Sequence, residues 1–163
     1  MGVHSRQNPE THIIFVCWGN ICRSPMAERI AEKMAQDEGL TGVAFTSAAT
    51  SREELGNPID PRAARVLQAA GYRASNHRAH QITAEEIQNA DLVIAMEQLH
   101  IDRMLRLAPD AENLVLMTDF DPTATPGSGI EDPWYGPASG FETTRAHLER
   151  AIPHLLTRLQ SHP

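Results

Sequence analysis

"VCWGNICRSP", residues 16–25, joins an apolar run to the expected start of a helix and contains both cysteines of the chain. Gly19 and Asn20 are residue types that tolerate positive φ, so the segment is able to curl until successive N–H groups point inward. Ser24 and the proline after it have the residue types of an N-cap and a first helical residue, which would direct the positive end of a helix into the same cavity. Arg23 adds a planar set of donors suited to two oxygens of one anion. The segment therefore predicts a loop that binds a tetrahedral oxyanion such as phosphate.

Cys17 ends the apolar run at the base of this loop. A buried cysteine taken alone is usually inert, but a thiol close to a helix N-terminus and a guanidinium is expected to be a thiolate near neutral pH. A thiolate in line with a bound phosphate predicts covalent phosphoryl transfer through a thiophosphate intermediate. The loop N–H groups and Arg23 would hold the charge that develops on the equatorial oxygens.

Residues 119–139 form a long segment rich in Pro, Gly and Asp. A loop of this length in a compact domain is usually functional, which predicts a lid. Asp132 in this segment is the candidate general acid, which would protonate the departing oxygen and later take a proton from the attacking water. Trp134 and Tyr135 would form the walls of a slot for a phenyl phosphate ester, and anchoring of the lid to the body is an equally good interpretation of either residue.

Short apolar runs alternate along the chain with segments of helical spacing. This alternation predicts an α/β domain with a four-stranded parallel sheet and helices on both faces. Ligands bind beyond the carboxyl ends of such strands, where the loop after the first strand lies. The expected strands are 12–17, 43–48, 90–96 and 112–117; the expected helices include 26–34, 63–70, 101–108 and 141–159, with a short extra helix opened by the capping box of Thr83 and Glu86.

Length and composition predict one soluble domain. The chain has 163 residues and is 41% hydrophobic, which is enough for one core, so we expect a flexible tail over 1–11 and a single domain over 12–163. Its 14 basic and 21 acidic residues give a net charge of −7 without a basic cluster, which argues against a nucleic-acid partner. No window has the ~20 apolar residues of a membrane span or the pattern of a signal peptide, so we expect a cytoplasmic protein with reduced cysteines and no membrane partner.

The sequence offers only weak support for a metal site. His77 and His80 form an H-x-x-H pair without a carboxylate or thiolate ligand at suitable spacing. We therefore predict no metal.

Three motifs, "VCWGNICRSPMAE", "DPWYG" and "NHRAHQIT", resemble the low-molecular-weight protein tyrosine phosphatases, and the resemblance extends in order over almost the whole chain. It implies a sheet of strand order 2-1-3-4, hydrolysis of phosphotyrosine on proteins with inorganic phosphate as product, and no metal or organic cofactor. We also expect a monomer or weak dimer. The resemblance makes Cys17 the nucleophile, Arg23 the transition-state clamp and Asp132 the general acid. It implies phosphate binding by Trp18, Gly19, Asn20, Ile21, Cys22 and Arg23, and support of the loop by Asn20, Ser24, Ser47 and His77.

Cys22 matches the second loop cysteine of that family. A reversible disulfide between Cys17 and Cys22 would protect the nucleophile from irreversible oxidation, which predicts redox regulation.

The sequence departs from the family pattern at the expected rim of the pocket. Where the family usually has "SAGTG" followed by an aromatic residue, this chain has "SAATSREE", with Ala49, Glu53 and Glu54. The added negative charge predicts a preference for substrates with basic residues beside the phosphotyrosine. Trp18 is bulkier than is usual at its position and would partly replace the missing wall, so the expected slot consists of Trp18, Glu53, Trp134 and Tyr135. Glu97 also stands where an aspartate is common.

Three alternatives remain open at this point. A phosphoarginine phosphatase would tend to have Thr in place of Ile21, and an arsenate reductase would need further cysteines beyond Cys17 and Cys22. A non-catalytic phosphopeptide-binding module would require the loop and Arg23 but neither the nucleophile nor the acid.

Overall fold

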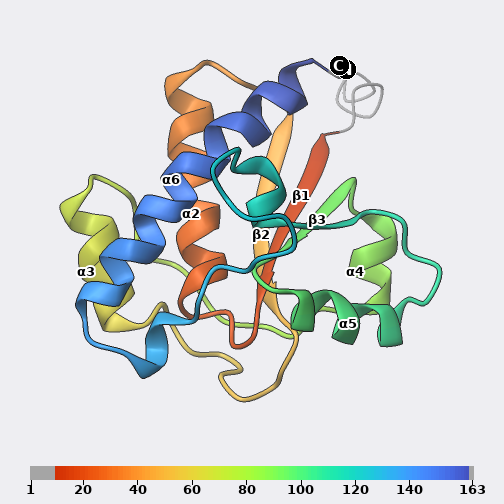
Figure 1. Cartoon of the computed structure of the whole chain (residues 1–163), viewed down its shortest axis with the longest axis horizontal. Coiled ribbons are helices and arrows are strands. Elements are labelled where there is room, and N and C mark those ends of the chain that lie inside the picture. Colours follow the sequence, from red (N-terminus) through yellow and green to blue (C-terminus); the bar gives the residue numbers. More distant parts are fainter. Residues whose placement is uncertain (1–9, 162–163) are drawn as a thin grey trace, which may run out of the picture.

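A four-stranded parallel sheet forms the centre of the molecule in the computed structural model, which describes residues 10–161 (Figure 1). The strands are β1 (Thr11–Cys17), β2 (Val43–Ala49), β3 (Leu92–Ala95) and β4 (Leu114–Leu116), in the order β2-β1-β3-β4 with every neighbouring pair parallel. The predicted fold class and strand order are therefore confirmed. β3 and β4 are shorter than predicted, because Ala90 serves as the C-cap of a helix and Met117 begins a 3-10 helix.

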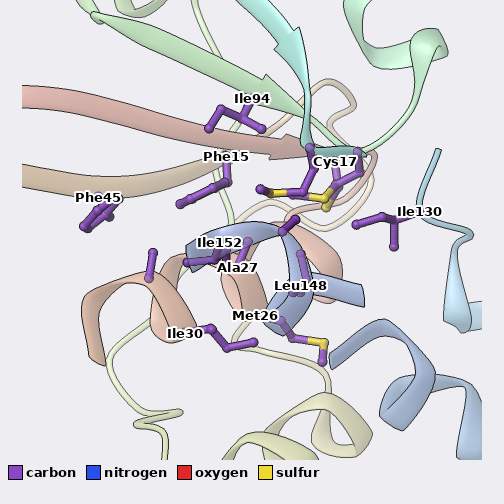
Figure 2. Close-up of a cluster of buried hydrophobic side chains, with 14 of the residues drawn as sticks. Phe15, Cys17, Met26, Ala27, Ile30, Phe45, Ile94, Ile130, Leu148 and Ile152 are labelled. Atoms are coloured by element: carbon purple, nitrogen blue, oxygen red, sulfur yellow. The ribbon is translucent and has the colours of Figure 1, made fainter. Parts of the chain in front are cut away.

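Helices cover both faces of the sheet, as predicted. On one face, α2 (Arg23–Asp37), α3 (Pro61–Ala69) and α6 (Ser139–Gln160) share a cluster of buried side chains with Ile13 and Phe15 of β1 (Figure 2). On the other face, α4 (Ala84–Asn89) and α5 (Gln98–Leu107) contribute to a cluster that contains Ile14 and Val16. Successive residues of a strand point to opposite faces, so the continuous apolar run of β1 supplies both clusters.

α4 and α3 begin with recognisable caps. The Thr83 side chain accepts a hydrogen bond from the N–H of Glu86, whose carboxylate accepts one from the N–H of Thr83, so the predicted capping box is confirmed. α3 begins at Asp60, whose carboxylate accepts from the N–H of Arg62, with Pro61 as the first helical residue.

The expected lid has more regular structure than its composition indicates. It includes the second half of the 3-10 helix η1 (Met117–Phe120) and all of η2 (Pro133–Tyr135). The N–H of Ile130 donates to the carbonyl of Met96 at 2.8 Å, directly after β3. The segment is therefore attached to the carboxyl edge of the sheet between its two 3-10 helices.

Most of the predicted tail, residues 1–9, lies outside the described residues. Thr11 is already the first residue of β1, so the strand begins one residue before the predicted boundary. Within residues 10–161, no helix combines the length and the apolar composition needed to cross a membrane.

Candidate active site

Asn20 determines the shape of the loop between β1 and α2. It is fully buried with a φ of 62°, and its side-chain amide donates to Ser24 Oγ at 2.8 Å and to Ser47 Oγ at 3.0 Å. Its Oδ1 accepts from the N–H of His80 at 3.1 Å, and its own carbonyl bonds to His77 Nε2 at 2.6 Å. The predicted supporting residues are thus brought together around Asn20, by its side chain and its main-chain carbonyl.

Gly19 does not have the positive φ that its residue type allows, which corrects the sequence expectation; of the two residues, only Asn20 has it. What Gly19 contributes is space, since a Cβ there would lie 3.1 Å from Glu54 Cγ. Its missing side chain lets the loop approach the segment after β2 closely.

Hydrogen-bond donors surround the sulfur of Cys17. The N–H groups of Asn20 and Ser24 lie 3.3 and 3.4 Å from Sγ, and Ser24 Oγ lies 3.0 Å from it. Donors directed at a sulfur stabilise its negatively charged form. Cys17 is buried at the end of β1, where Figure 2 shows it with Ile130 of the lid in the same buried cluster.

Ser24 is not the N-cap that the sequence predicted. α2 begins at Arg23 with Cys22 in the cap position, and no side chain caps its first turn. The Ser24 hydroxyl is directed to Cys17 and Asn20 instead, because the loop turns back over the end of β1.

Several main-chain N–H groups of the loop have no acceptor. Within residues 10–161, no hydrogen bond is formed by the N–H groups of Trp18, Gly19, Ile21, Cys22 and Arg23. Main-chain donors enclosed in a protein nearly always have a partner, so this row of N–H groups is suited to an anion.

Arg23 is held beside the loop by an ion pair that the sequence had not weighed. Only 2% of its side chain is exposed, and its Nη1 donates to Glu97 Oε2 and to the carbonyl of Ile130. Its Nη2 lies 3.5 Å from Asp132 Oδ2. The guanidinium is therefore held both by Glu97, which follows β3, and by Ile130 and Asp132 of the lid.

A cavity of about 130 Å³ brings the three predicted catalytic residues together. Asp132 in its wall is the N-cap of η2, since Oδ1 accepts from the N–H of Trp134 at 3.0 Å. The cavity is lined by Cys17, Trp18, Gly19, Ile21, Cys22, Arg23, Glu53, Glu54, Asp132, Trp134 and Tyr135, so all residues of the expected slot border it.

Two arginines that the sequence analysis missed hold the aromatic walls. The guanidinium of Arg62 lies 5.0 Å from the ring centre of Trp134 and 4.6 Å from that of Phe141, which attaches the lid to α3 and α6. The guanidinium of Arg103 in α5 lies 4.5 Å from the ring centre of Trp18. Trp134 thus both anchors the lid and borders the cavity, whereas Tyr135 is 86% exposed. The "IDPR" helix start was a signal for Arg62; nothing local distinguished Arg103.

A second layer of polar groups supports the loop. Ser47 Oγ donates to Glu28 at 2.6 Å, and burial raises the pKa of that carboxyl. Burial lowers the pKa of His77 despite its bond to the Asn20 carbonyl, so the ring is neutral and donates through Nε2. Glu28 and the neutral ring of His77 therefore hold Ser47 and Asn20 in place, and neither adds a positive charge.

Cys22 differs from Cys17 in its surroundings. Burial, followed by the charges of Asp60 and Cys17, raises the pKa of the Cys22 thiol strongly. Cys22 therefore stays protonated, and Cys17 is the better candidate for a nucleophile.

Among residues 10–161, no three side chains of His, Cys, Asp or Glu are grouped so that they could hold a metal ion. His80 pairs with Glu86 at 2.9 Å, and His77 is occupied by Asn20.

Comparison with known proteins gives a consistent result. The sequence profile described as "Low molecular weight phosphotyrosine protein phosphatase" matches residues 12–162. A low molecular weight protein-tyrosine phosphatase A from Mycobacterium tuberculosis is 41% identical over 146 residues, which cover 88% of each chain. The crystal structure of a protein tyrosine phosphatase from Entamoeba histolytica, with Hepes in its active site, has a TM-score of 0.87 at 30% identity and covers 93% of this chain and 98% of its own. YwlE from Bacillus subtilis, an arginine phosphatase solved with a phosphorylated active-site serine in place of cysteine, has a TM-score of 0.84 at 27% identity and covers 93% and 97%.

Proposed function

The chain belongs to the low molecular weight phosphotyrosine protein phosphatase family, and from that premise we propose that it hydrolyses phosphotyrosine on proteins through a cysteinyl-phosphate intermediate formed on Cys17. It is a phosphoric monoester hydrolase of the protein-tyrosine-phosphatase class. The observation that carries the proposed mechanism is the row of unpartnered loop N–H groups beside a sulfur that two N–H donors and the Ser24 hydroxyl surround.

In the first step, the Cys17 thiolate attacks the phosphorus and the bond to the tyrosyl oxygen breaks. The loop N–H groups and Arg23 bind the equatorial oxygens, where charge develops in the transition state. Arg23 is oriented for this by Glu97 and the Ile130 carbonyl, so it needs little rearrangement when phosphate arrives.

Asp132 would protonate the leaving tyrosyl oxygen in this step. In the second step the same carboxylate takes a proton from water, which attacks the phosphorus and releases inorganic phosphate and the Cys17 thiolate. Before substrate binds, Asp132 lies beside Arg23 in the wall of the cavity, which is where a leaving group above the loop would stand.

Turnover of para-nitrophenyl phosphate tests this mechanism. The wild type should hydrolyse it, Cys17→Ser should lose turnover, and Asp132→Ala should be slower by about a hundredfold to ten-thousandfold with an altered pH profile. Wild-type turnover in Cys17→Ser would contradict the covalent step. Binding of phosphotyrosine without hydrolysis by the wild type would favour a phosphopeptide-binding module.

The substrate class is tested with a panel of phosphotyrosine, phosphoserine and phosphoarginine peptides. Ile21 lines the cavity with an apolar side chain, which suits an aryl ester, so phosphotyrosine should give the highest kcat/KM. Preference for phosphoarginine would instead align the chain with its arginine-phosphatase relative.

We also propose that oxidation regulates the enzyme. Peroxide would convert the Cys17 thiolate to a sulfenic acid, and the Cys22 thiol would displace water from it to give the disulfide; a thiol reductant would restore both groups. In Cys22→Ser the sulfenic acid would be oxidised further to the irreversible sulfinic acid, so reductant should recover less turnover after peroxide than in the wild type. We further propose that the protein acts in the cytoplasm as a monomer or weak dimer.

A further inference from the structure

A second cavity adjoins the catalytic one. It has a volume of about 440 Å³ and shares Trp18, Arg23, Asp132 and Tyr135 with the catalytic cavity, so the two meet along these residues. Its other walls are Glu97, Leu99, His100 and Glu131, from the start of α5 and from the lid. The proposed reaction uses none of Leu99, His100 and Glu131.

The charged groups of this second cavity do not balance. Glu97 and Asp132 both pair with the single guanidinium of Arg23. Glu131 is exposed and forms no hydrogen bond or ion pair with any residue between 10 and 161. The cavity thus has three carboxylates and one buried cation, which leaves Glu131 available to an external positive charge.

His100 adds a buried donor without an acceptor. The side chain is fully buried, and its Nδ1 accepts the N–H of Glu97 at 3.1 Å, so in the neutral ring Nε2 carries the proton. Burial, and then the charges of Arg23 and Arg103, lowers the pKa of His100 to about 3, which keeps the ring neutral. Nε2 has no hydrogen-bond partner among the described residues. A buried donor of this kind is suited to an oxygen atom that enters the cavity.

We propose that the second cavity is a substrate subsite for a lysine or arginine residue next to the phosphotyrosine. The Glu131 carboxylate pairs with the cationic group, and Leu99, which is 50% exposed, contacts the aliphatic stem. Once a side chain of the cavity wall shifts and uncovers it, the buried Nε2–H of His100 donates to an oxygen that the bound residue supplies, a main-chain carbonyl or the water bound to it. This inference rests on the proposed function, because it assigns the neighbour of the phosphotyrosine.

The arrangement of the two cavities supports this assignment. A phosphotyrosine ring in the catalytic cavity lies between walls that include Trp18 and Tyr135, and both residues also border the second cavity. An extended peptide advances only about 3.3–3.6 Å per residue, so a residue adjacent to the phosphotyrosine is within reach of the second cavity.

Binding of non-hydrolysable peptides tests the subsite separately from catalysis. Each peptide contains phosphonomethyl-phenylalanine, with arginine, norleucine or glutamate placed on either side of it in turn. For the wild type, arginine at one of these positions should lower Kd by about threefold to tenfold relative to norleucine, as expected for one charged hydrogen bond at a partly exposed site. Glu131→Gln should make the Kd values of the arginine and norleucine peptides equal, and Glu131→Lys should make the glutamate peptide the best ligand.

Glu112→Gln is the matched control, since Glu112 is exposed before the amino end of β4, at the opposite edge of the sheet, and it should keep the wild-type ratio. Equal Kd values of the wild type for all six peptides, or an unchanged ratio in Glu131→Gln, would overturn the subsite. If instead the proposed phosphatase activity were wrong, the wild type would not hydrolyse para-nitrophenyl phosphate. Absence of phosphonate binding altogether would overturn both.

Discussion

Single residues of this site do more than their types indicate. Asn20 combines a left-handed backbone with a side chain that bonds Ser24, Ser47 and the N–H of His80. Substitution of Asn20 by alanine would remove these side-chain hydrogen bonds. Substitution by glycine would also remove them but would keep the left-handed backbone conformation. His100 is a comparable case, because it begins α5 by accepting the N–H of Glu97 and so helps to fix the carboxylate that holds Arg23.

Replacement of His100 by Asn should make the protein less sensitive to acid. The pKa of His100 falls from 6.5 in its ordinary state to about 3 in the fold, so between these values the unfolded chain binds a proton that the folded chain does not. The free energy of unfolding therefore falls as pH falls, by up to about 1.4 kcal/mol per pH unit from this group. Asn keeps an acceptor for the N–H of Glu97 but has no such proton.

The measurement is urea unfolding of both proteins between about pH 7 and about pH 4. The wild type should lose more stability over this range than His100→Asn. His77, whose lowered pKa acts in the same direction, is present in both proteins and cancels. Parallel pH curves would contradict the assignment.

At the level of elements, the lid is positioned by contacts at both of its sides. Ile130 accepts a hydrogen bond from Arg23 and donates one to Met96, while η2 is attached to α3 and α6 through Arg62. Burial alone would raise the pKa of Asp60, but hydrogen bonds from Arg62 lower it, so Asp60 stays ionised and orients the guanidinium. The N–H of Asp60 in turn donates to the carbonyl of Ile21, so the lid and the phosphate loop share one support.

Arg62→Leu should loosen the lid. It removes the stacking on Trp134 and leaves the buried carboxylate of Asp60 unpaired, so we expect kcat on para-nitrophenyl phosphate to fall about tenfold and stability to fall by about 1–3 kcal/mol. Arg62→Lys keeps the charge without the planar face and should be intermediate. Arg65→Leu, an exposed position on the same helix, should change stability by less than about 0.5 kcal/mol. Kinetics and urea unfolding measure both quantities, and equal effects at positions 62 and 65 would refute the role of Arg62.

The whole molecule gathers its functional groups at one edge of the sheet. All four strands are parallel, so the loop after β1, the segment after β2, Glu97 after β3 and the lid after β4 lie at the same carboxyl edge. Glu53 and Glu54 from the segment after β2 border the catalytic cavity and add negative charge to its mouth, in a chain whose net charge is already −7. We therefore expect long-range selection against acidic substrates.

Reversal of both charges, with Glu53→Lys and Glu54→Lys, should improve kcat/KM on acidic phosphopeptides relative to basic ones. The expected gain is about tenfold at low ionic strength and smaller as salt screens the mouth. Glu85→Lys with Glu112→Lys gives the same net charge at exposed positions away from the cavity and should produce little change. The same gain in both double variants, or none in either, would remove the local electrostatic explanation.

The sheet and the loop between β1 and α2 could be predicted from the sequence, because strand runs, helix starts and the loop motif are encoded by neighbouring residues. The grouping of Asp132 with Cys17 and Arg23 was inferred instead from the composition of the long loop and from the resemblance to the phosphatase family, since Asp132 lies far along the chain from both. The sequence did not determine the cap of α2, since the Ser24 hydroxyl bonds to Cys17 once the loop turns back over β1. The folded chain was needed to show that Glu97, 74 residues from Arg23, fixes the guanidinium of Arg23, and that Arg62 and Arg103 hold the aromatic walls. These pairs form because the parallel sheet brings distant strand ends to one edge, and nothing in either local sequence specifies its partner.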